Sequence, residues 1–68
     1  MKTFAENLRR YRKVCGLTQA QVARRIQVDR TTYTKYESGA VEPSIATLRT
    51  LCDVLQVTPN DLFGWESE

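Results

Sequence analysis

Four polar side chains between residues 30 and 37 have the types and the spacing to form one hydrogen-bonding surface. They are Arg30, Thr31, Thr34 and Lys35. If this segment is helical, a rotation of about 100° per residue places all four opposite Tyr33 and Tyr36. An arginine can donate two hydrogen bonds to O6 and N7 of guanine, a lysine can reach guanine or a phosphate, and a threonine can contact a base edge or a thymine methyl group. The alternative is an ordinary solvated polar face.

Positive charge is concentrated in the first part of the chain. The 68 residues carry a net charge of only +2, which is too small to indicate a polyanionic partner. Residues 1–36, however, contain nine lysines and arginines and two acidic residues, and therefore carry +7. Residues 37–68 contain one arginine and six acidic residues, and carry −5. The first part can therefore face a polyanion, whereas the second part has a different role.

The composition argues against several classes of protein. The chain has no histidine, no glycine-rich phosphate loop and only two cysteines, Cys15 and Cys52, so we expect no metal, no cofactor and no enzymatic activity. We interpret both cysteines as small buried apolar residues, with a disulfide or a reactive thiol as the alternatives. No segment has the apolar length of a signal peptide or a membrane span, so we expect a cytoplasmic protein without membrane contact.

Local signals predict where the first two helices begin and end. Thr3 and Thr18 each stand three residues before a Glu or Gln, which is the pattern of a capping box. The first helix is therefore expected over about residues 4–14, with Gly16 after its end. The second is expected over about residues 19–26.

Three further helices complete an all-α domain. Asp29 is an expected N-cap for a helix over about residues 30–37, although the threonines and tyrosines of this segment leave a strand as the alternative. Ser44 and Thr58 are expected to cap the fourth and fifth helices. The apolar stripe of the fourth helix is expected to face the core and consists of Ile45, Leu48, Leu51, Cys52 and Leu55. We therefore predict one compact five-helix domain over residues 1–68.

The second and third predicted helices have the spacing of a helix-turn-helix, over about residues 18–37, whose second helix can enter the major groove of DNA. Four segments carry a family pattern: Leu-Thr-Gln-Ala-Gln-Val-Ala at 17–23, Val-Asp-Arg-Thr-Thr-Tyr at 28–33, Tyr-Glu-Ser-Gly at 36–39 and Pro-Ser at 43–44. They resemble the phage repressor and Cro-like helix-turn-helix family, also called the xenobiotic-response-element type. The resemblance runs from about Leu8 to Leu62 and implies a lambda-repressor-like fold.

Two residues depart from the pattern of this family. Gln27 occupies the turn position where the family often has glycine, so a positive φ at this residue would strain the backbone. Tyr33 is bulkier than the branched aliphatic residue that the family usually has there, so the third helix is expected to sit slightly differently.

The resemblance implies a set of phosphate-contacting residues, namely Thr18, Gln19, Ser38, Gly39 and Ala40. Free backbone N–H groups at the start of the second helix also favour a phosphate near Gln19. In related repressors the matching glutamine supports the first reading residue, here Arg30. Helix capping is the alternative role for Thr18, Gln19 and Gln21, and the two roles can hold together. Arg9 and Arg10 are interpreted as solvated charges, with contact to DNA as the alternative.

The resemblance also implies a partly buried ion pair between Arg12 and Glu37. This pair would join the first helix to the end of the third and so orient the reading helix. Its net contribution to stability need not be large, because desolvation opposes the Coulomb attraction.

One short reading helix covers few base pairs, so the resemblance implies a homodimer on a pseudo-palindromic operator. Leu62, Phe63 and Trp65 are the candidate dimer surface, and closure of the core is their alternative role. The implied function is that of a sequence-specific, double-stranded DNA-binding transcriptional regulator that acts as a repressor. The alternative is a protein-interaction module with a protein partner, such as an antitoxin or an anti-repressor component.

Overall fold

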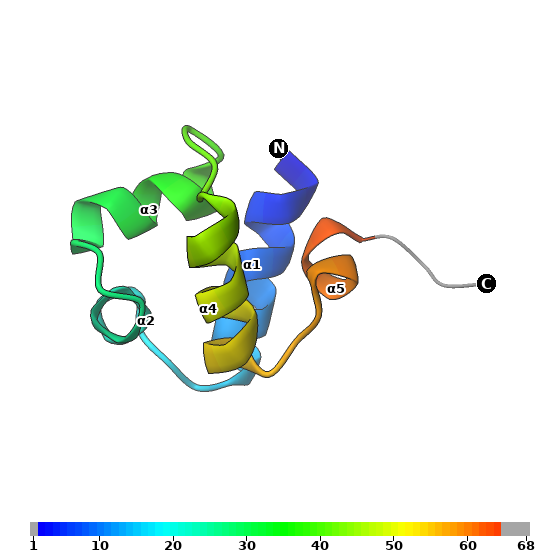
Figure 1. The fold of residues 1–68 in the computed structure, drawn as a ribbon, viewed down its shortest axis with the longest axis horizontal. Helices are drawn as coiled ribbons and strands as arrows, with labels where there is room; N and C mark the ends of the chain where they lie inside the picture. Colours follow the sequence, from blue (N-terminus) through cyan, green and yellow to red (C-terminus); the bar gives the residue numbers. More distant parts are fainter. Residues whose placement is uncertain (1, 65–68) are drawn as a thin grey trace.

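The computed structural model describes residues 2–64 and folds them into a bundle of five helices (Figure 1). The helices are α1 (Lys2–Val14), α2 (Gln19–Arg25), α3 (Arg30–Ser38), α4 (Ile45–Leu55) and α5 (Pro59–Phe63). This arrangement confirms the predicted all-α fold and excludes the strand considered for residues 30–37. No helix among these residues is long and apolar enough to cross a bilayer. Trp65 of the candidate dimer surface lies outside the described residues.

Helix α1 connects the two ends of the bundle. It packs against both α3 and α5, while α2 contacts α3 and α4. In Figure 1, α2 and α3 therefore lie together at one end of the molecule and α5 lies at the other. The core contains apolar residues from all five helices: Phe4, Leu8, Val22, Ala23, Ile26, Tyr33, Tyr36, Leu51, Cys52, Leu55 and Leu62. This shared core fixes the α2–α3 pair relative to α1.

Four of the predicted N-caps are present. The side chains of Thr18, Asp29, Ser44 and Thr58 each accept a hydrogen bond from the backbone N–H three residues later. Thr18 also closes the predicted capping box, because its own N–H donates to Oε1 of Gln21 over 2.8 Å. Each cap satisfies an N–H group that the helix leaves free, so local sequence determines where α2 to α5 begin.

Thr3, in contrast, is not an N-cap. Helix α1 begins at Lys2, so Thr3 lies within its first turn and the predicted start at residue 4 was wrong. Phe4 and Ala5 are both buried in this turn, and the rings of Phe4 and Phe63 have their centroids 5.3 Å apart. Packing against α5 therefore supports helical backbone ahead of the predicted start.

Two residues expected in the core are exposed. Ile45 is 79% exposed at the first position of α4. At about 100° per residue it lies roughly 70° from the centre of the apolar stripe of α4, so it turns away from the core. Cys15 is also exposed, because it follows the end of α1 at Val14. Cys52 is buried as predicted and both thiols are free, so the disulfide alternative is wrong.

The turn between α2 and α3 contains the expected departure from glycine. Gln27 has φ = 62°, in the left-handed region that favours glycine. The turn is nevertheless closed by hydrogen bonds, because the N–H of Gln27 donates to the Arg24 carbonyl over 3.2 Å and that of Val28 to the Ala23 carbonyl over 3.0 Å. The backbone at residue 27 therefore has the left-handed conformation that glycine adopts without strain, whereas the side chain of Gln27 makes this conformation strained.

Candidate nucleic-acid interface

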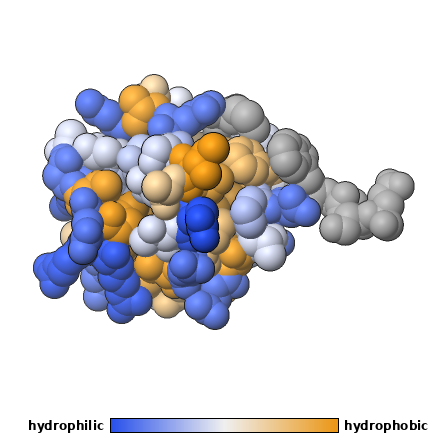
Figure 2. All heavy atoms as spheres, in the orientation of Figure 1, coloured by the Kyte–Doolittle hydropathy of each residue, from blue (hydrophilic) through white to orange (hydrophobic). Residues whose placement is uncertain are grey.

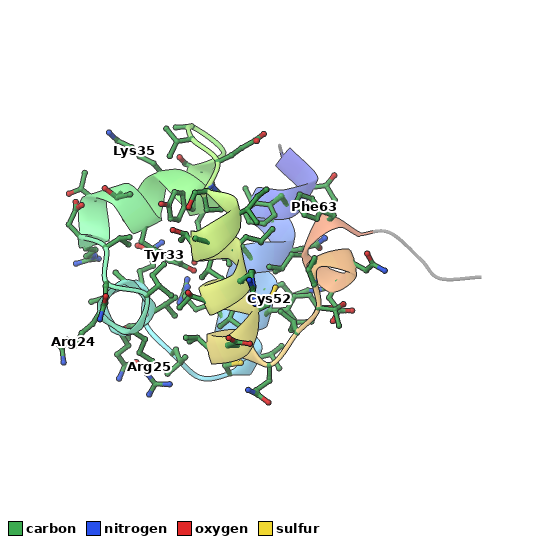
Figure 3. The ribbon with its side chains drawn as sticks, in the orientation of Figure 1. Arg24, Arg25, Tyr33, Lys35, Cys52 and Phe63 are labelled. Atoms are coloured by element: carbon green, nitrogen blue, oxygen red, sulfur yellow. The ribbon has the colours of Figure 1, made fainter. Side chains whose placement is uncertain are left out.

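Helix α3 presents one buried and one exposed face, as its sequence predicts. Tyr33 and Tyr36 are 0% and 7% exposed and lie in the core. The exposed face carries Arg30, Thr31, Thr34 and Lys35, which line a shallow surface hollow together with Gln19 of α2. Figure 3 shows Lys35 pointing away from the molecule, whereas Tyr33 lies on the inner side of α3. The two tyrosines thus hold the polar face outward.

Exposed positive charge extends from α3 onto α2. Arg24 and Arg25 form the end of α2 and are both exposed. They point away from the bundle in Figure 3, and Figure 2 shows hydrophilic side chains gathered over the same region. The helix-turn-helix end of the molecule is therefore basic and hydrophilic.

The predicted ion pair between Arg12 and Glu37 is present. Nε of Arg12 lies 2.6 Å from Oε2 of Glu37, and Nη2 donates to Oε1 over 3.2 Å. The third nitrogen, Nη1, donates to the carbonyl of Leu17 over 2.8 Å. The Arg12 and Glu37 side chains are only 11% and 4% exposed. One buried arginine therefore connects α1, the α1–α2 loop and the last turn of α3.

Glu37 accepts two further hydrogen bonds, from the hydroxyl of Tyr33 and from Nε2 of Gln19 over 3.1 Å. Burial by itself would raise the pKa of Glu37, but the hydrogen bonds from Arg12, Tyr33 and Gln19 lower it below the ordinary value. The same bond to Glu37 raises the pKa of Arg12, and burial raises that of Tyr33. Glu37 is therefore a carboxylate at neutral pH, surrounded by donors.

Gln19 contacts Thr34 rather than the expected Arg30. Its Oε1 accepts a hydrogen bond from the Thr34 hydroxyl over 3.3 Å, while its Nε2 is held by Glu37. Both ends of the Gln19 amide are thus directed toward α3, one at a buried side chain and one at an exposed side chain. Gln19 was predicted to support Arg30, but it bonds to Thr34, which lies about one helical turn after Arg30.

The expected backbone donors after α3 are already used within the protein. Gly39 has φ = 82° and closes the helix, with its N–H donating to the carbonyl of Lys35. The N–H of Ala40 donates to the same carbonyl over 3.0 Å, and the Ser38 hydroxyl donates to it over 3.1 Å. The left-handed glycine thus turns both N–H groups back onto the helix end, and the phosphate contact expected of Ser38, Gly39 and Ala40 stays a prediction.

Arg9 is exposed, as expected of a solvated charge, and it also lies beside the α3 face. It lines a hollow whose other residues are Arg12, Gln19, Thr34, Glu37 and Ser38. A neighbouring hollow on α1 is lined by Glu6, Arg9, Arg10 and Lys13. The sequence could have predicted this location, because Arg9 precedes Arg12 by three residues and therefore lies on the same side of α1.

Leu62 and Phe63 have different surroundings. Leu62 is 0% exposed and belongs to the core, which is the alternative role considered for it. Phe63 is half-buried and lines an apolar hollow together with Phe4, Glu42, Pro43 and Leu48. Val41 is also exposed, so apolar surface does occur beside this hollow. Within the described residues no group of three His, Cys, Asp or Glu side chains could hold a metal ion.

These features define a class of protein, the small helical domains with a helix-turn-helix. The chain belongs to the helix-turn-helix domain family, which matches it over residues 3–62.

Two relatives of this chain are named as transcriptional regulators. The chain is 39% identical over 64 residues to YqaE, named an HTH-type transcriptional regulator, of Bacillus subtilis, covering 94% of this chain and 55% of that protein. It is 38% identical over 64 residues to RstR, the cryptic phage CTXphi transcriptional repressor of Vibrio cholerae, with 93% and 57% covered. The chain therefore spans about half the length of these curated relatives.

A third relative and one solved structure extend the comparison. The HTH-type transcriptional activator BcrR of Enterococcus faecalis is 35% identical over 63 residues, covering 93% of this chain and 31% of that protein. The structure of the P22 c2 repressor in complex with a synthetic operator superposes with a TM-score of 0.87 at 24% identity, covering 97% of this chain and 100% of that one. The structural likeness demonstrates a shared fold.

Proposed function

We propose that this chain is one domain that binds double-stranded DNA sequence-specifically and regulates transcription, with α3 in the major groove. The observation that carries the proposal is the α3 face formed by Arg30, Thr31, Thr34 and Lys35, which is exposed while its helix is held by two buried tyrosines. Such a face matches the donor and acceptor pattern of base edges. The relatives named as regulators and the repressor–operator complex of similar fold support this role.

Repression is the mode that we propose, by occupation of an operator. This mode is supported by one relative, which is named as a phage transcriptional repressor. Activation is the alternative mode, because another relative is named as a transcriptional activator. A bound domain that covers promoter DNA needs no separate catalytic group, and no enzymatic step is required for this role.

Phosphate contacts are assigned to side chains around the α1–α2–α3 junction. Arg9 and Gln19 line one hollow with Ser38 and Thr34, beside the α3 face. The second Nε2 hydrogen of Gln19 can donate to a phosphate oxygen, and Arg9 supplies a positive charge. Thr18 supports this site through its N-cap, which fixes the position of Gln19 at the start of α2, and its own contact with a phosphate stays a prediction.

We further propose that two copies bind pseudo-palindromic half-sites about one helical turn apart. The apolar hollow that contains Phe63 supports a contact between copies, as do the exposed side chains of Val41 and Ile45. Leu62 is assigned to the core and is left out of this surface. The same apolar side chains would serve the protein-interaction alternative, in which the partner is another protein.

Selection of bound fragments from random double-stranded DNA tests the proposal. We expect enrichment of one sequence, repeated with inverted symmetry, by the unchanged protein. Arg30→Ala should relax the choice at one base pair of each half-site, whereas Arg49→Ala, at an exposed position of α4, should leave the selected sequence unchanged. Recovery of fragments without any common sequence would reject sequence-specific binding and favour the interaction module.

A further inference from the structure

The hydroxyl of Thr34 stands at the end of a chain of hydrogen bonds that begins inside the protein. Buried Glu37 is bonded to Nε2 of Gln19 over 3.1 Å, and Oε1 of Gln19 is bonded to the hydroxyl of Thr34 over 3.3 Å. Thr34 itself is exposed on the face of α3 that we assign to DNA. An internal ionised group is therefore connected, through one amide, to a side chain that would meet a base.

The chemistry of Glu37 fixes the direction of every bond in this chain. A carboxylate can only accept hydrogen bonds, so it must face the NH₂ group of Gln19 and not its oxygen. The amide oxygen of Gln19 is then turned toward Thr34. Because that oxygen also only accepts, the Thr34 hydroxyl must donate its single hydrogen to Gln19.

We propose that this polarity makes Thr34 an obligatory hydrogen-bond acceptor at the DNA surface, so that it selects cytosine or adenine at the base it meets. In the major groove cytosine offers the N4 amino group and adenine the N6 amino group as donors, whereas guanine and thymine offer acceptors at O6 and O4. Because its hydrogen is already donated to Gln19, the Thr34 hydroxyl can accept a hydrogen bond from cytosine or adenine, but it repels the acceptor oxygens of guanine and thymine. This inference rests on the proposed function and adds to it the base preference at the one position that Thr34 contacts.

Thr31 provides a matched comparison on the same helix. It is equally exposed on the α3 face, and within residues 2–64 no hydrogen bond holds its hydroxyl. Its hydrogen can therefore rotate, so that Thr31 donates or accepts as the base requires. Of these two threonines, only Thr34 is expected to have a fixed polarity.

The test is selection from random DNA with four versions of the full chain: unchanged, Thr34→Val, Thr34→Ser and Thr31→Val. The unchanged protein should prefer cytosine or adenine at one position of its half-site. Thr34→Val should lower that preference about three- to tenfold, the factor expected for one neutral hydrogen bond, and Thr34→Ser should keep it. Thr31→Val should act at a different position.

Gln19→Ala distinguishes a fixed acceptor from a hydroxyl that merely touches the base. Without the Gln19 oxygen the hydroxyl of Thr34 can rotate, so guanine and thymine should become acceptable at that position while the rest of the sequence is retained. Circular dichroism would establish that each variant is folded, which we expect of the Thr34 and Thr31 variants because both side chains are exposed. For Gln19→Ala the same measurement is the required control, because Gln19 bonds to the buried carboxylate of Glu37.

Three results would overturn the inference while leaving the proposed function in place. They are a preference of the unchanged protein for guanine at the position that Thr34→Val alters, a preference of the unchanged protein for thymine at that position, and no effect of Thr34→Val at any position. If the unchanged protein selects no sequence at all, the proposed function fails and the inference fails with it.

Discussion

Arg12 of α1 and Glu37 of α3, which are separated by 25 positions in the sequence, form a nearly buried ion pair with Nε 2.6 Å from Oε2. The pair is also the point from which the polar face of α3 is organised, because Glu37 holds Gln19 and Gln19 holds Thr34. Orientation of the reading helix and polarity of one reading residue therefore depend on the same carboxylate.

Removal of one partner of this pair should be strongly destabilising. Arg12→Ala leaves the Glu37 carboxylate buried without its charged partner, and we expect the free energy of unfolding to fall by about 3–5 kcal/mol. Urea denaturation followed by circular dichroism measures the change. Arg49→Ala, at an exposed position of α4, should change the stability by less than about 0.5 kcal/mol. Equal effects of the two variants would contradict the structural role of Arg12.

Acidification should weaken the fold through Glu37. The folded pKa lies below the ordinary value of 4.5, so the carboxylate favours the folded state fully above about pH 4.5 and loses this contribution as the pH falls through the folded pKa. Urea midpoints measured from pH 7 to pH 3 should therefore decrease. The double variant Arg12→Met and Glu37→Gln, which lacks the titrating group, should show a shallower decrease. Asp29→Asn is the necessary comparison, because hydrogen bonds from Thr32 also lower the pKa of Asp29. An unchanged pH profile in the double variant would reject the assignment to Glu37.

Gln27→Gly should stabilise the domain. At φ = 62° a glycine avoids the steric strain of the glutamine side chain, and we expect a gain of about 1 kcal/mol in the free energy of unfolding. Ala46→Gly, in the first turn of helix α4, should instead lower the free energy of unfolding, by up to about 1 kcal/mol. Thermal denaturation of the two variants compares them directly, and a loss of stability in Gln27→Gly would show that the side chain has a favourable contact that outweighs the strain.

Arg9→Ala should weaken binding to every DNA sequence by a similar factor. If Arg9 contacts a phosphate, its loss also reduces the slope of log affinity against log salt concentration by about 1. Fluorescence anisotropy titrations at several salt concentrations give both quantities. A change in base preference, or an unchanged slope, would argue against a phosphate contact by Arg9.

Features determined by neighbouring residues were predictable from the sequence. The caps Thr18, Asp29, Ser44 and Thr58 depend on bonds that span three positions, and all four were identified. The outward face of α3 followed from helical periodicity alone. The positive φ of Gln56, which ends α4, was missed because neither Gly nor Asn marks it.

Features that depend on how the helices meet were not predictable. The bond between Gln19 and Thr34, for example, is decided by the packing of α2 on α3. The Arg12–Glu37 pair was expected only from a family resemblance, since nothing local connects two residues 25 positions apart. Side-chain pairs across helices therefore required the tertiary structure.

Sequence-specific recognition by α3 is tested by the ratio of the affinities for the selected duplex and for a scrambled duplex of equal length, determined by fluorescence anisotropy at near-physiological salt. We predict a ratio of about 10³ or more for the unchanged protein, and a steep fall of both affinities with increasing salt. Equal affinities for the two duplexes, at every salt concentration, would contradict sequence-specific recognition by α3.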